Sequence, residues 1–354
     1  MKAFKNPCRT GRAVVIWTLM LGMSLMGAGG WANPVDASAH RVGYDYYQVG
    51  DLGAARPGAT EPALLLVGGG EWPRGALIWW VAKGGHGHFV ILRASGADNL
   101  QQELYSKIGG VASVQTLVFH DRAAASDPQV LDVLRHADAI FIAGGDQANY
   151  VRFWKGTPLN RVLDRHVAEG KPIGGTSAGL AILGGYAYGA LDGGSITSSE
   201  ALGNPLGGQV TLVSDFLHLP HMQDVITDTH FNARGRLGRL IAFIANLRHA
   251  GHASVIGLGV DQGSALGVDG HGIGRLFTGD NGFAWLVRPQ GQPVRIRTGQ
   301  PLDYPAVRVT GIGPGSRLDM RDFSVQQPAF EANAAVHDGK LSLHGAPPSV
   351  SSAH

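Results

Sequence analysis

Cysteine is nearly absent from this sequence, since Cys8 is the only one in 354 residues. The chain after residue 32 can therefore form no disulfide, bind no metal through thiolates and use no cysteine as a nucleophile. Charged residues are also scarce, at 16%, whereas glycine is abundant, with 53 residues. Many of these glycines separate short apolar runs, which is typical of a compact α/β protein and not of a disordered chain.

Acidic residues are missing from the first 32 positions, which contain four basic residues, an apolar run over residues 13–26 and small residues leading to Ala32. This order is typical of a secretory signal peptide. The apolar run is also shorter than the about 20 residues that a membrane-spanning helix needs. We therefore predict a signal peptide over residues 1–32 and a mature protein that is exported, to the periplasm or the extracellular medium.

Removal of this segment changes the charge of the protein. Four of the 29 basic residues and none of the 27 acidic residues lie in it, so the formal net charge falls from +2 to about −2. The mature chain then has no compositional feature that favours nucleic acid or an anionic membrane surface. We predict neither as a partner, and a homodimer is compatible with the sequence.

Apolar runs alternate with helical patterns between residues 61 and 270. Strands are expected at residues 63–67, 88–93, 113–119 and 138–143, and helices at residues 97–109, 128–136 and 149–169. Strands that are apolar throughout and alternate with helices indicate a parallel sheet covered on both faces. The sequence thus predicts a catalytic α/β domain of three layers, with ligands at the glycine-rich carboxyl edge of its strands.

The segments on either side of this domain have other patterns. Residues 33–60 show little periodicity and predict an extended N-terminal segment. Residues 271–345 contain short strand-like runs separated by turns, including one at residues 294–297, which indicates a β-rich C-terminal extension of antiparallel strands. Residues 346–354 are rich in Pro and Ser and predict a disordered tail.

A serine nucleophile is predicted at Ser177, because Gly175, Ser177 and Gly179 fit the pattern G-x-S-x-G between a strand and an apolar helix start. A sharp strand-to-helix turn holds the serine in a strained conformation and needs small neighbours. The helix start also presents the N–H of Ala178 to a developing oxyanion.

A serine hydroxyl needs a base to become nucleophilic, and His230 is the best candidate. It follows a short apolar run and precedes a basic segment that begins a helix. The pairs His86/His88 and His218/His221 lack the carboxylate spacing of a metal site. We expect no metal and no organic cofactor.

Three blocks of the sequence together resemble the signature blocks of cyanophycinases. These blocks are residues 141–147, 174–179 and 228–239, and their order and spacing match over roughly residues 63–267. Cyanophycinases belong to a serine peptidase family that also contains the α-aspartyl dipeptidases. The resemblance implies a class I glutamine amidotransferase-like, flavodoxin-like fold, with serine where amidotransferases have cysteine. It also implies exopeptidase cleavage of cyanophycin, an arginine-bearing polyaspartate, to β-Asp-Arg dipeptides.

Site residues follow from the same resemblance. It implies Ser177 as the nucleophile, His230 as the base, and Gly144 and Gly145 beside the oxyanion with Ala178. The residues that match substrate-binding positions are Gln147, Asp228, Thr229, Arg234, Arg236 and Arg239. Guanidinium groups suit the carboxylates of such a polymer, and a carboxylate suits its arginines; the alternative is a solvated basic helix face. Thr229 departs from the pattern, because cyanophycinases usually have glutamine there.

The acid of the triad has two candidates. Asp192 lies 15 residues after Ser177, a spacing similar to that of the dipeptidase branch. Glu200 is the competitor, on a turn that could return to the same edge of the sheet.

Three alternative functions remain. The first is a secreted peptidase acting on small aspartyl or isoaspartyl peptides. The second is an α/β-hydrolase esterase, although His230 lies only 53 residues after Ser177 and over 100 before the C-terminus, whereas that fold places its histidine near the end of the domain. The third is a non-catalytic periplasmic binding protein, which the presence of both Ser177 and His230 disfavours.

Overall fold

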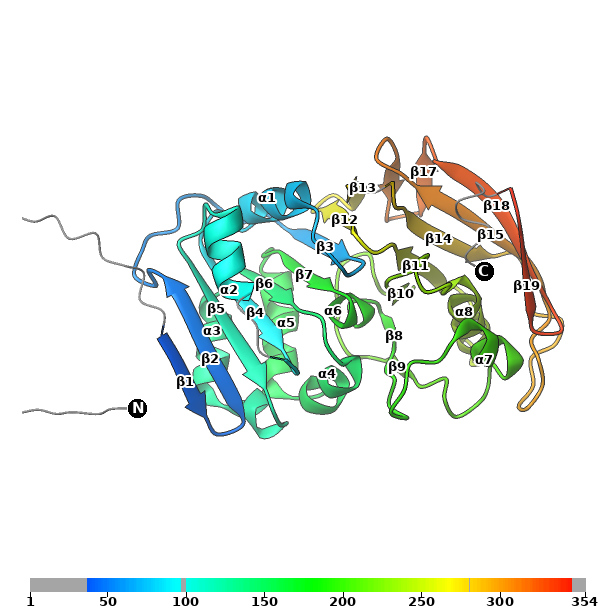
Figure 1. Cartoon of the computed structure of the whole chain (residues 1–354), viewed down its shortest axis with the longest axis horizontal. Coiled ribbons are helices and arrows are strands. Elements are labelled where there is room, and N and C mark those ends of the chain that lie inside the picture. The colour runs from blue at the N-terminus through cyan, green and yellow to red at the C-terminus, as the bar shows by residue number, and fades with distance from the viewer. Residues whose placement is uncertain (1–36, 97–99, 280, 346–354) are drawn as a thin grey trace, which may run out of the picture. The chain divides into compact units, whose positions relative to one another are not determined.

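The computed structural model describes residues 37–96, 100–279 and 281–345, which form two β-sheets with helices packed on them (Figure 1). The predicted signal peptide, with Cys8, and the predicted tail lie outside the described residues. Within the described residues, no helix is both long enough and apolar enough to cross a membrane.

The first sheet has 11 strands in the order β1-β2-β5-β4-β6-β7-β3-β12-β13-β16-β17. Its central strands β5, β4, β6, β7 and β3 are parallel, and antiparallel strands extend it on both sides. In chain order its strands are β1 (Ala37–Arg41), β2 (Tyr44–Gly50), β3 (Ala63–Val67), β4 (His88–Arg93), β5 (Ser113–Phe119), β6 (Ala139–Ile142), β7 (Ile173–Thr176), β12 (Ser264–Asp269), β13 (Ile273–Thr278), β16 (Arg317–Asp319) and β17 (Ser324–Gln326).

The second sheet has eight strands in the order β19-β18-β15-β14-β11-β10-β8-β9, and only β8, β10 and β11 pair in parallel. In chain order its strands are β8 (Tyr186–Tyr188), β9 (Leu212–Ser214), β10 (Val225–Asp228), β11 (Ile256–Val260), β14 (Ala284–Pro289), β15 (Tyr304–Ile312), β18 (Phe330–His337) and β19 (Lys340–His344). The turn between β11 and β12 carries the chain from the second sheet to the first.

The helices are short and mostly follow strands of the parallel core. They are α1 (Arg74–Lys83), α2 (Leu100–Glu103), the π-helical turn η1 (Leu104–Ile108), the 3₁₀ turn η2 (Ala123–Ser126), α3 (Pro128–His136), α4 (Gln147–Trp154), α5 (Pro158–Ala168), α6 (Ala178–Ala181), α7 (Ser198–Gly203) and α8 (Leu237–His249).

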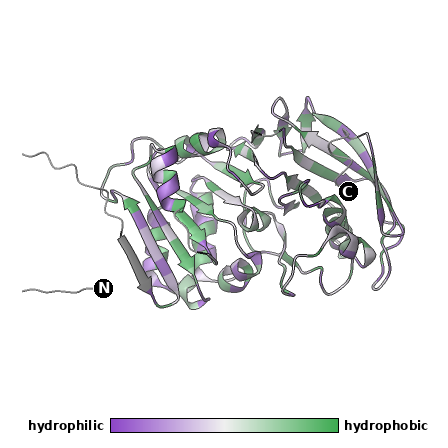
Figure 2. Ribbon diagram, viewed as in Figure 1, coloured by the Kyte–Doolittle hydropathy of each residue, from purple (hydrophilic) through white to green (hydrophobic). Residues whose placement is uncertain are grey.

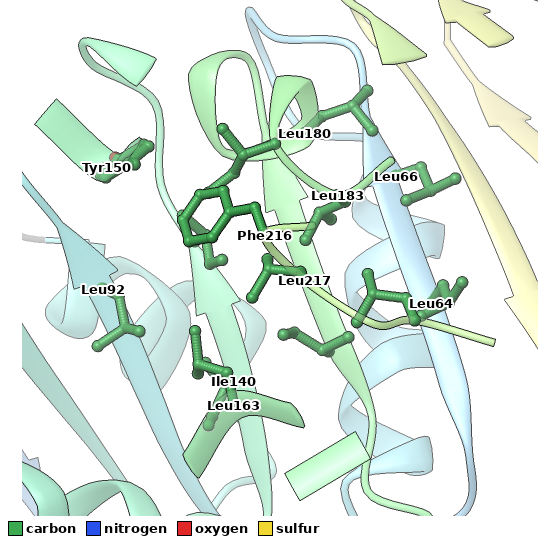
Figure 3. Close-up of a cluster of buried hydrophobic side chains, with 14 of the residues drawn as sticks. Leu64, Leu66, Leu92, Ile140, Tyr150, Leu163, Leu180, Leu183, Phe216 and Leu217 are labelled. Carbon is green, nitrogen blue, oxygen red and sulfur yellow. The ribbon is translucent and has the colours of Figure 1, made fainter. Parts of the chain in front are cut away.

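Successive side chains of the central strands point to opposite faces of the sheet, and each face is covered by helices. In β3, Leu64 and Leu66 pack with Leu163 of α5, whereas Leu65 and Val67 pack on the opposite face with Trp80 of α1 (Figure 3 shows the first group). Both faces of a central strand are therefore buried, which explains its continuous apolar sequence. Figure 2 shows these strands largely in hydrophobic colours and hydrophilic segments on the helices around them. A separate core lies between α8 and the second sheet.

The predicted three-layer α/β class with antiparallel additions is confirmed. The helix predicted over residues 149–169 is two helices, because Thr157 caps α5 through the Asn160 N–H and Pro158 begins that helix. The strand predicted at residues 294–297 is only a single bridge between Arg295 and Asp303.

The segments predicted outside the central domain are distributed differently in the structure. Residues 33–60, predicted as an extended segment, include the antiparallel pair β1 and β2, and β2 pairs with β5. Residues 271–345 contribute strands to both sheets, and β8 to β11 of the second sheet precede residue 271. The predicted boundary at residue 270 therefore does not coincide with a boundary between the sheets.

Candidate active site

Ser177 lies on the sharp turn between β7 and α6, with φ 52° and ψ −119°. This positive φ is unfavourable for a residue with a side chain, and here the packing around it holds it. A Cβ on Gly175 would lie 2.7 Å from the backbone of Gly179, and one on Gly179 would lie 2.0 Å from the Ile142 oxygen. Glycine is thus required at both positions so that the turn can close against β6.

His230 follows β10 of the second sheet, and its Nε2 lies 2.9 Å from Ser177 Oγ. Its backbone also has a positive φ, of 44°, and its N–H donates to the Gly68 oxygen across the sheets. A Cβ on Gly69 would lie only 2.3 Å from the imidazole ring. The glycine turn after β3 therefore packs directly against the histidine.

The second ring nitrogen of His230 contacts an amide and not a carboxylate. Gln262 Oε1 lies 2.8 Å from His230 Nδ1. Asp192 is exposed on a turn, and Glu200 accepts hydrogen bonds from the N–H and hydroxyl of Thr197 as the capping box of α7. In the part of the chain that the structure describes, neither carboxylate hydrogen-bonds to His230. The structure therefore gives Gln262, and neither predicted acid, as the hydrogen-bond partner of His230 Nδ1.

Two backbone segments lie beside the Ser177 hydroxyl and bring N–H groups near it. Ala178 is the first residue of α6, and a Cβ on Gly144 would lie 3.8 Å from Ser177 Oγ, which places the Gly144–Gly145 turn beside the hydroxyl. Among residues 37–96, 100–279 and 281–345, no acceptor is found for the N–H of Gly145 or of Ala178. Such free donors beside a serine can stabilise an oxyanion.

Asp228, Arg236 and Arg239 form a buried ionic cluster at the end of β10. Arg239 donates from Nε and Nη2 to the two Asp228 oxygens, at 2.7 and 2.6 Å. Arg236 Nη1 lies 3.3 Å from Asp228 Oδ1 and also donates to the carbonyl and hydroxyl oxygens of Thr229, at 2.8 and 3.0 Å. The predicted substrate-binding residues are thus brought together, but they bind one another.

Arg239 has further partners inside the protein. Its Nη1 donates to Ser195 Oγ at 2.9 Å and to the Ile196 oxygen at 3.1 Å. Its guanidinium carbon lies 5.4 Å from the centre of the Tyr188 ring and 5.8 Å from that of Phe243, within range of cation–π attraction. The side chain is only 4% exposed. Arg239 therefore connects Asp228 of β10 to the loop of residues 195–196 and stabilises this wall of the site.

A cavity of about 290 Å³ opens beside Ser177. Its charged lining residues are Asp146, Asp228, Arg234, Arg236 and Arg239, and its other lining includes Gly145, Gln147, Tyr188, Ser195 and Thr229. Gln147 is the first residue of α4 and lines this cavity. Arg234 is exposed, and in the described residues its guanidinium has no hydrogen bond or ion pair. The cavity therefore has one more cation than anion and one guanidinium that can bind a ligand.

The surroundings of His230 favour its neutral form. Burial lowers the pKa of His230, the hydrogen bond to Gln262 raises it, and the nearby Arg234 and Arg236 lower it further, with a net decrease from the ordinary value of 6.5. Burial likewise lowers the pKa of Arg236 to about 10, against the attraction of Asp228. A neutral imidazole can accept the serine proton.

Sequence reasoning missed Gln262, Tyr188 and Ser195. Gln262 lies in a polar turn directly after the strand β11, and such a turn at the carboxyl end of a strand was a usable signal. Among the described residues, no three His, Cys, Asp or Glu side chains converge as metal ligands would.

An α/β sheet with an elbow serine hydrogen-bonded to a histidine defines a serine-type hydrolase. Comparison with known proteins agrees: the model of peptidase family S51 matches residues 100–276. The chain is 32% identical over 245 residues to a cyanophycinase of Synechococcus elongatus, covering 67% of this chain and 70% of that protein. It is 28% identical over 225 residues to a cyanophycinase of Trichormus variabilis, covering 61% and 70%.

Among solved structures, a peptidase from an acI-B1 Actinobacterium has a TM-score of 0.51 and 17% sequence identity, covering 74% of this chain and 98% of that one. That likeness supports the fold. This chain is a serine-type peptidase. It belongs to peptidase family S51.

Proposed function

We propose that this peptidase is an exported exopeptidase that hydrolyses cyanophycin to β-Asp-Arg dipeptides. The observation that carries the proposal is the cavity beside Ser177, which holds the free guanidinium of Arg234 and an excess of one positive charge. A guanidinium binds a carboxylate through two parallel hydrogen bonds, so a substrate with carboxylates close to the cleaved bond fits this site. The similarity to cyanophycinases narrows the substrate class.

The proposed reaction begins when Ser177 Oγ attacks the carbonyl carbon of the cleaved amide. The C–O bond forms, the carbonyl electron pair moves onto oxygen, and the serine proton passes to His230 Nε2 over the 2.9 Å contact. The N–H groups of Gly145 and Ala178 bind the oxyanion. His230 then gives its proton to the leaving nitrogen as the carbonyl re-forms and the C–N bond breaks. Water next attacks the acyl carbon and gives a proton to His230, which returns a proton to Ser177 Oγ as the bond between the acyl carbon and Oγ breaks.

The other residues of the cavity wall complete this proposal. Arg234 binds a substrate carboxylate, and Gln147 contacts the chain from α4. The buried cluster of Asp228, Arg236 and Arg239 keeps the wall in place. The cavity, at about 290 Å³, is at the lower end of the size range for small-molecule sites. A site of this size suits release of a short product.

The direct test is incubation of mature protein with cyanophycin granules, with soluble dipeptide measured by mass spectrometry. We expect β-Asp-Arg to be released and Ser177→Ala to abolish its release. A parallel panel of α- and β-aspartyl dipeptides and short acyl esters tests the alternatives. Cleavage of the small peptides or esters without any release from granules would reject cyanophycin as the substrate.

One observation favours the small aspartyl peptides as a second candidate. Thr229 stands where cyanophycinases usually have glutamine, and its hydroxyl is bound by Arg236 at 3.0 Å. A shorter side chain at this point removes one polar contact with a long substrate. The Thr229→Gln variant should raise kcat/KM on granules relative to dipeptides if this residue decides the preference.

Export rests on the sequence pattern of residues 1–32. Expression of the full chain, followed by fractionation and N-terminal sequencing, tests it. We expect a mature N-terminus after Ala32 outside the cytoplasm. An unprocessed chain confined to the cytoplasm would overturn this part of the proposal.

A further inference from the structure

The partner of His230 Nδ1 differs in charge from the acid that a serine triad ordinarily supplies. Gln262 Oε1 occupies that position at 2.8 Å. For His230 Nε2 to accept the Ser177 proton, Nδ1 must carry the hydrogen. The amide must then present its oxygen, as it does in this structure. The contact therefore selects the tautomer that the base needs.

The carboxylate next to Gln262 accepts hydrogen bonds from two backbone N–H groups and one indole N–H. Asp261 is buried, and its Oδ1 accepts from the Asn232 N–H and from Trp285 Nε1, both at 2.9 Å. Its Oδ2 accepts from the Phe283 N–H at 2.9 Å. These bonds tie the turn to β14 and to the loop that follows His230. Asp261 thus holds the turn, and Gln262 alone reaches the imidazole.

Other charged groups near His230 do not replace the missing acid. Asp228 precedes it by two residues, but both of its oxygens bind Arg236 or Arg239. Arg234 and Arg236 face the imidazole with positive charge and lower its pKa. The glycine turn of residues 68–70 brings no charge to the ring. The group hydrogen-bonded to Nδ1 of a forming imidazolium is therefore a dipole and not an anion, and Asp228 acts on the ring only through space.

We propose that Gln262 is the positioning residue of this active site, and that the Ser177–His230 pair works with a neutral amide in the place of a triad acid. This inference rests on the proposed role of Ser177 and His230. In the attack step the serine proton moves to Nε2, while the Nδ1–H bond stays intact and donates to the amide oxygen throughout. No carboxylate takes part.

Two consequences follow for the pH dependence of the reaction. Burial lowers the pKa of His230, and no carboxylate at Nδ1 opposes this effect, so the acid limb of activity lies below pH 6.5. Gln262→Glu would place a carboxylate against Nδ1 and favour the protonated ring. The acid limb should then move upward by about one pH unit or more.

The test measures the rate at which a fluorophosphonate modifies Ser177 across pH, because this rate reports the activated serine whatever the natural substrate is. Gln262→Met keeps the side-chain length but removes the acceptor. We expect labelling to slow by about tenfold to hundredfold, since the buried N–H loses its partner. Gln262→Glu should label at a rate near or above that of the wild type, with the shifted acid limb. Gln292→Met, at another exposed glutamine outside the helices and strands, is the matched control and should behave as wild type.

The outcomes separate the two proposals. Unchanged labelling by Gln262→Met, or an unshifted acid limb in Gln262→Glu, would overturn the role of Gln262. Slower labelling in the first variant and a shifted limb in the second would support it, even if the wild type released nothing from cyanophycin. A wild type that neither labels at Ser177 nor hydrolyses any substrate would overturn the proposed function and this inference together. Melting temperatures close to that of the wild type would show that the variants are folded.

Discussion

The two sheets contribute to the site in different ways. The first sheet contributes Ser177 on a turn of small, uncharged residues, where close backbone packing determines the geometry. The second sheet contributes His230 next to a buried ionic cluster, where the charges of Asp228, Arg236 and Arg239 determine it. The comparison shows that the nucleophile depends on steric fit, whereas the segment that carries the base depends on electrostatic compensation as well. The Ser177 turn and the His230 segment should therefore be sensitive to different kinds of mutation.

The largest loss of activity is expected at the contact between Ser177 and His230. Ser177→Ala and His230→Ala should each lower kcat by about 10⁴-fold or more, and the double variant should be no worse than either single one, because the two residues act as a unit. Initial rates of product release measure this. Additive losses in the double variant would mean that the hydrogen bond between the sheets is not part of the reaction.

Loss of charge compensation should destabilise the second sheet strongly. Asp228→Asn leaves two buried guanidinium groups without their anion, and we expect the free energy of unfolding to fall by about 3–5 kcal/mol. Chemical denaturation measures the change. Asp338→Asn is the control, since Asp338 is 62% exposed and pairs with Arg295 at the surface, where the loss should stay below about 1 kcal/mol. Equal losses in both variants would contradict the comparison.

Acid should destabilise the first sheet through His166 of α5. Burial lowers the pKa of this histidine to about 4, and its Nε2–H donates to the Pro172 oxygen at 3.0 Å. The unfolded chain binds this proton near the ordinary pKa of 6.5, whereas the folded chain does not until about pH 4. Stability is therefore lost as the pH falls through this window, by about 3 kcal/mol.

Denaturation at the two ends of this pH window measures the loss. His166→Gln should remove most of this pH dependence, because glutamine keeps a donor but takes up no proton. His136→Gln, at an exposed histidine of α3, should keep it. A slope that survives in His166→Gln would assign the acid sensitivity to other groups.

The smallest effect is expected at the contact between the turn after β3 and His230. Gly69 has a φ of +103°, and an added Cβ would lie 2.3 Å from the imidazole. Gly69→Ala should lower the free energy of unfolding by about 1–3 kcal/mol and also slow the modification of Ser177. Gly208→Ala, where an added Cβ meets no atom within 4 Å, should change neither. If Gly69→Ala changed neither the free energy of unfolding nor the rate of Ser177 modification, His230 would tolerate displacement by an added methyl group.

Local patterns in the sequence predicted the parts of this molecule that depend on local structure. Continuous apolar runs identified β3, β4, β5 and β6 because both faces of these strands are buried. The elbow around Ser177 was recognisable because a strand, a tight turn and a helix start are adjacent in the chain. His230 was identified from its own block, and its contact with Ser177 agrees with that prediction.

Features that depend on distant contacts were not predictable in the same way. Gln262 reaches His230 because β10 and β11 are parallel neighbours, so the turns that follow them lie at the same edge of the second sheet. The turn after β11 was visible in the sequence, but no local pattern encodes the pairing of residues 32 positions apart. The pairing of Asp228 with Arg239 spans 11 positions and depends on the start of α8. Glu200 is the opposite case, since Thr197 and Glu200 have the spacing of a helix capping box, which the sequence already displayed.

The turn between β11 and β12 has one further consequence. Asp261 is bonded to residues of the second sheet, Gly263 donates to the Gly69 oxygen after β3, and Gln262 holds the histidine between them. A compound that acylates Ser177 and hydrogen-bonds to His230 joins the same two parts a second time. The acyl group stays attached when the chain unfolds, so such an inhibitor should raise Tm only through the contacts it makes in the folded state, of which the hydrogen bond to His230 is one. Thermal shift can thus rank covalent ligands of this site by the contact they make with His230.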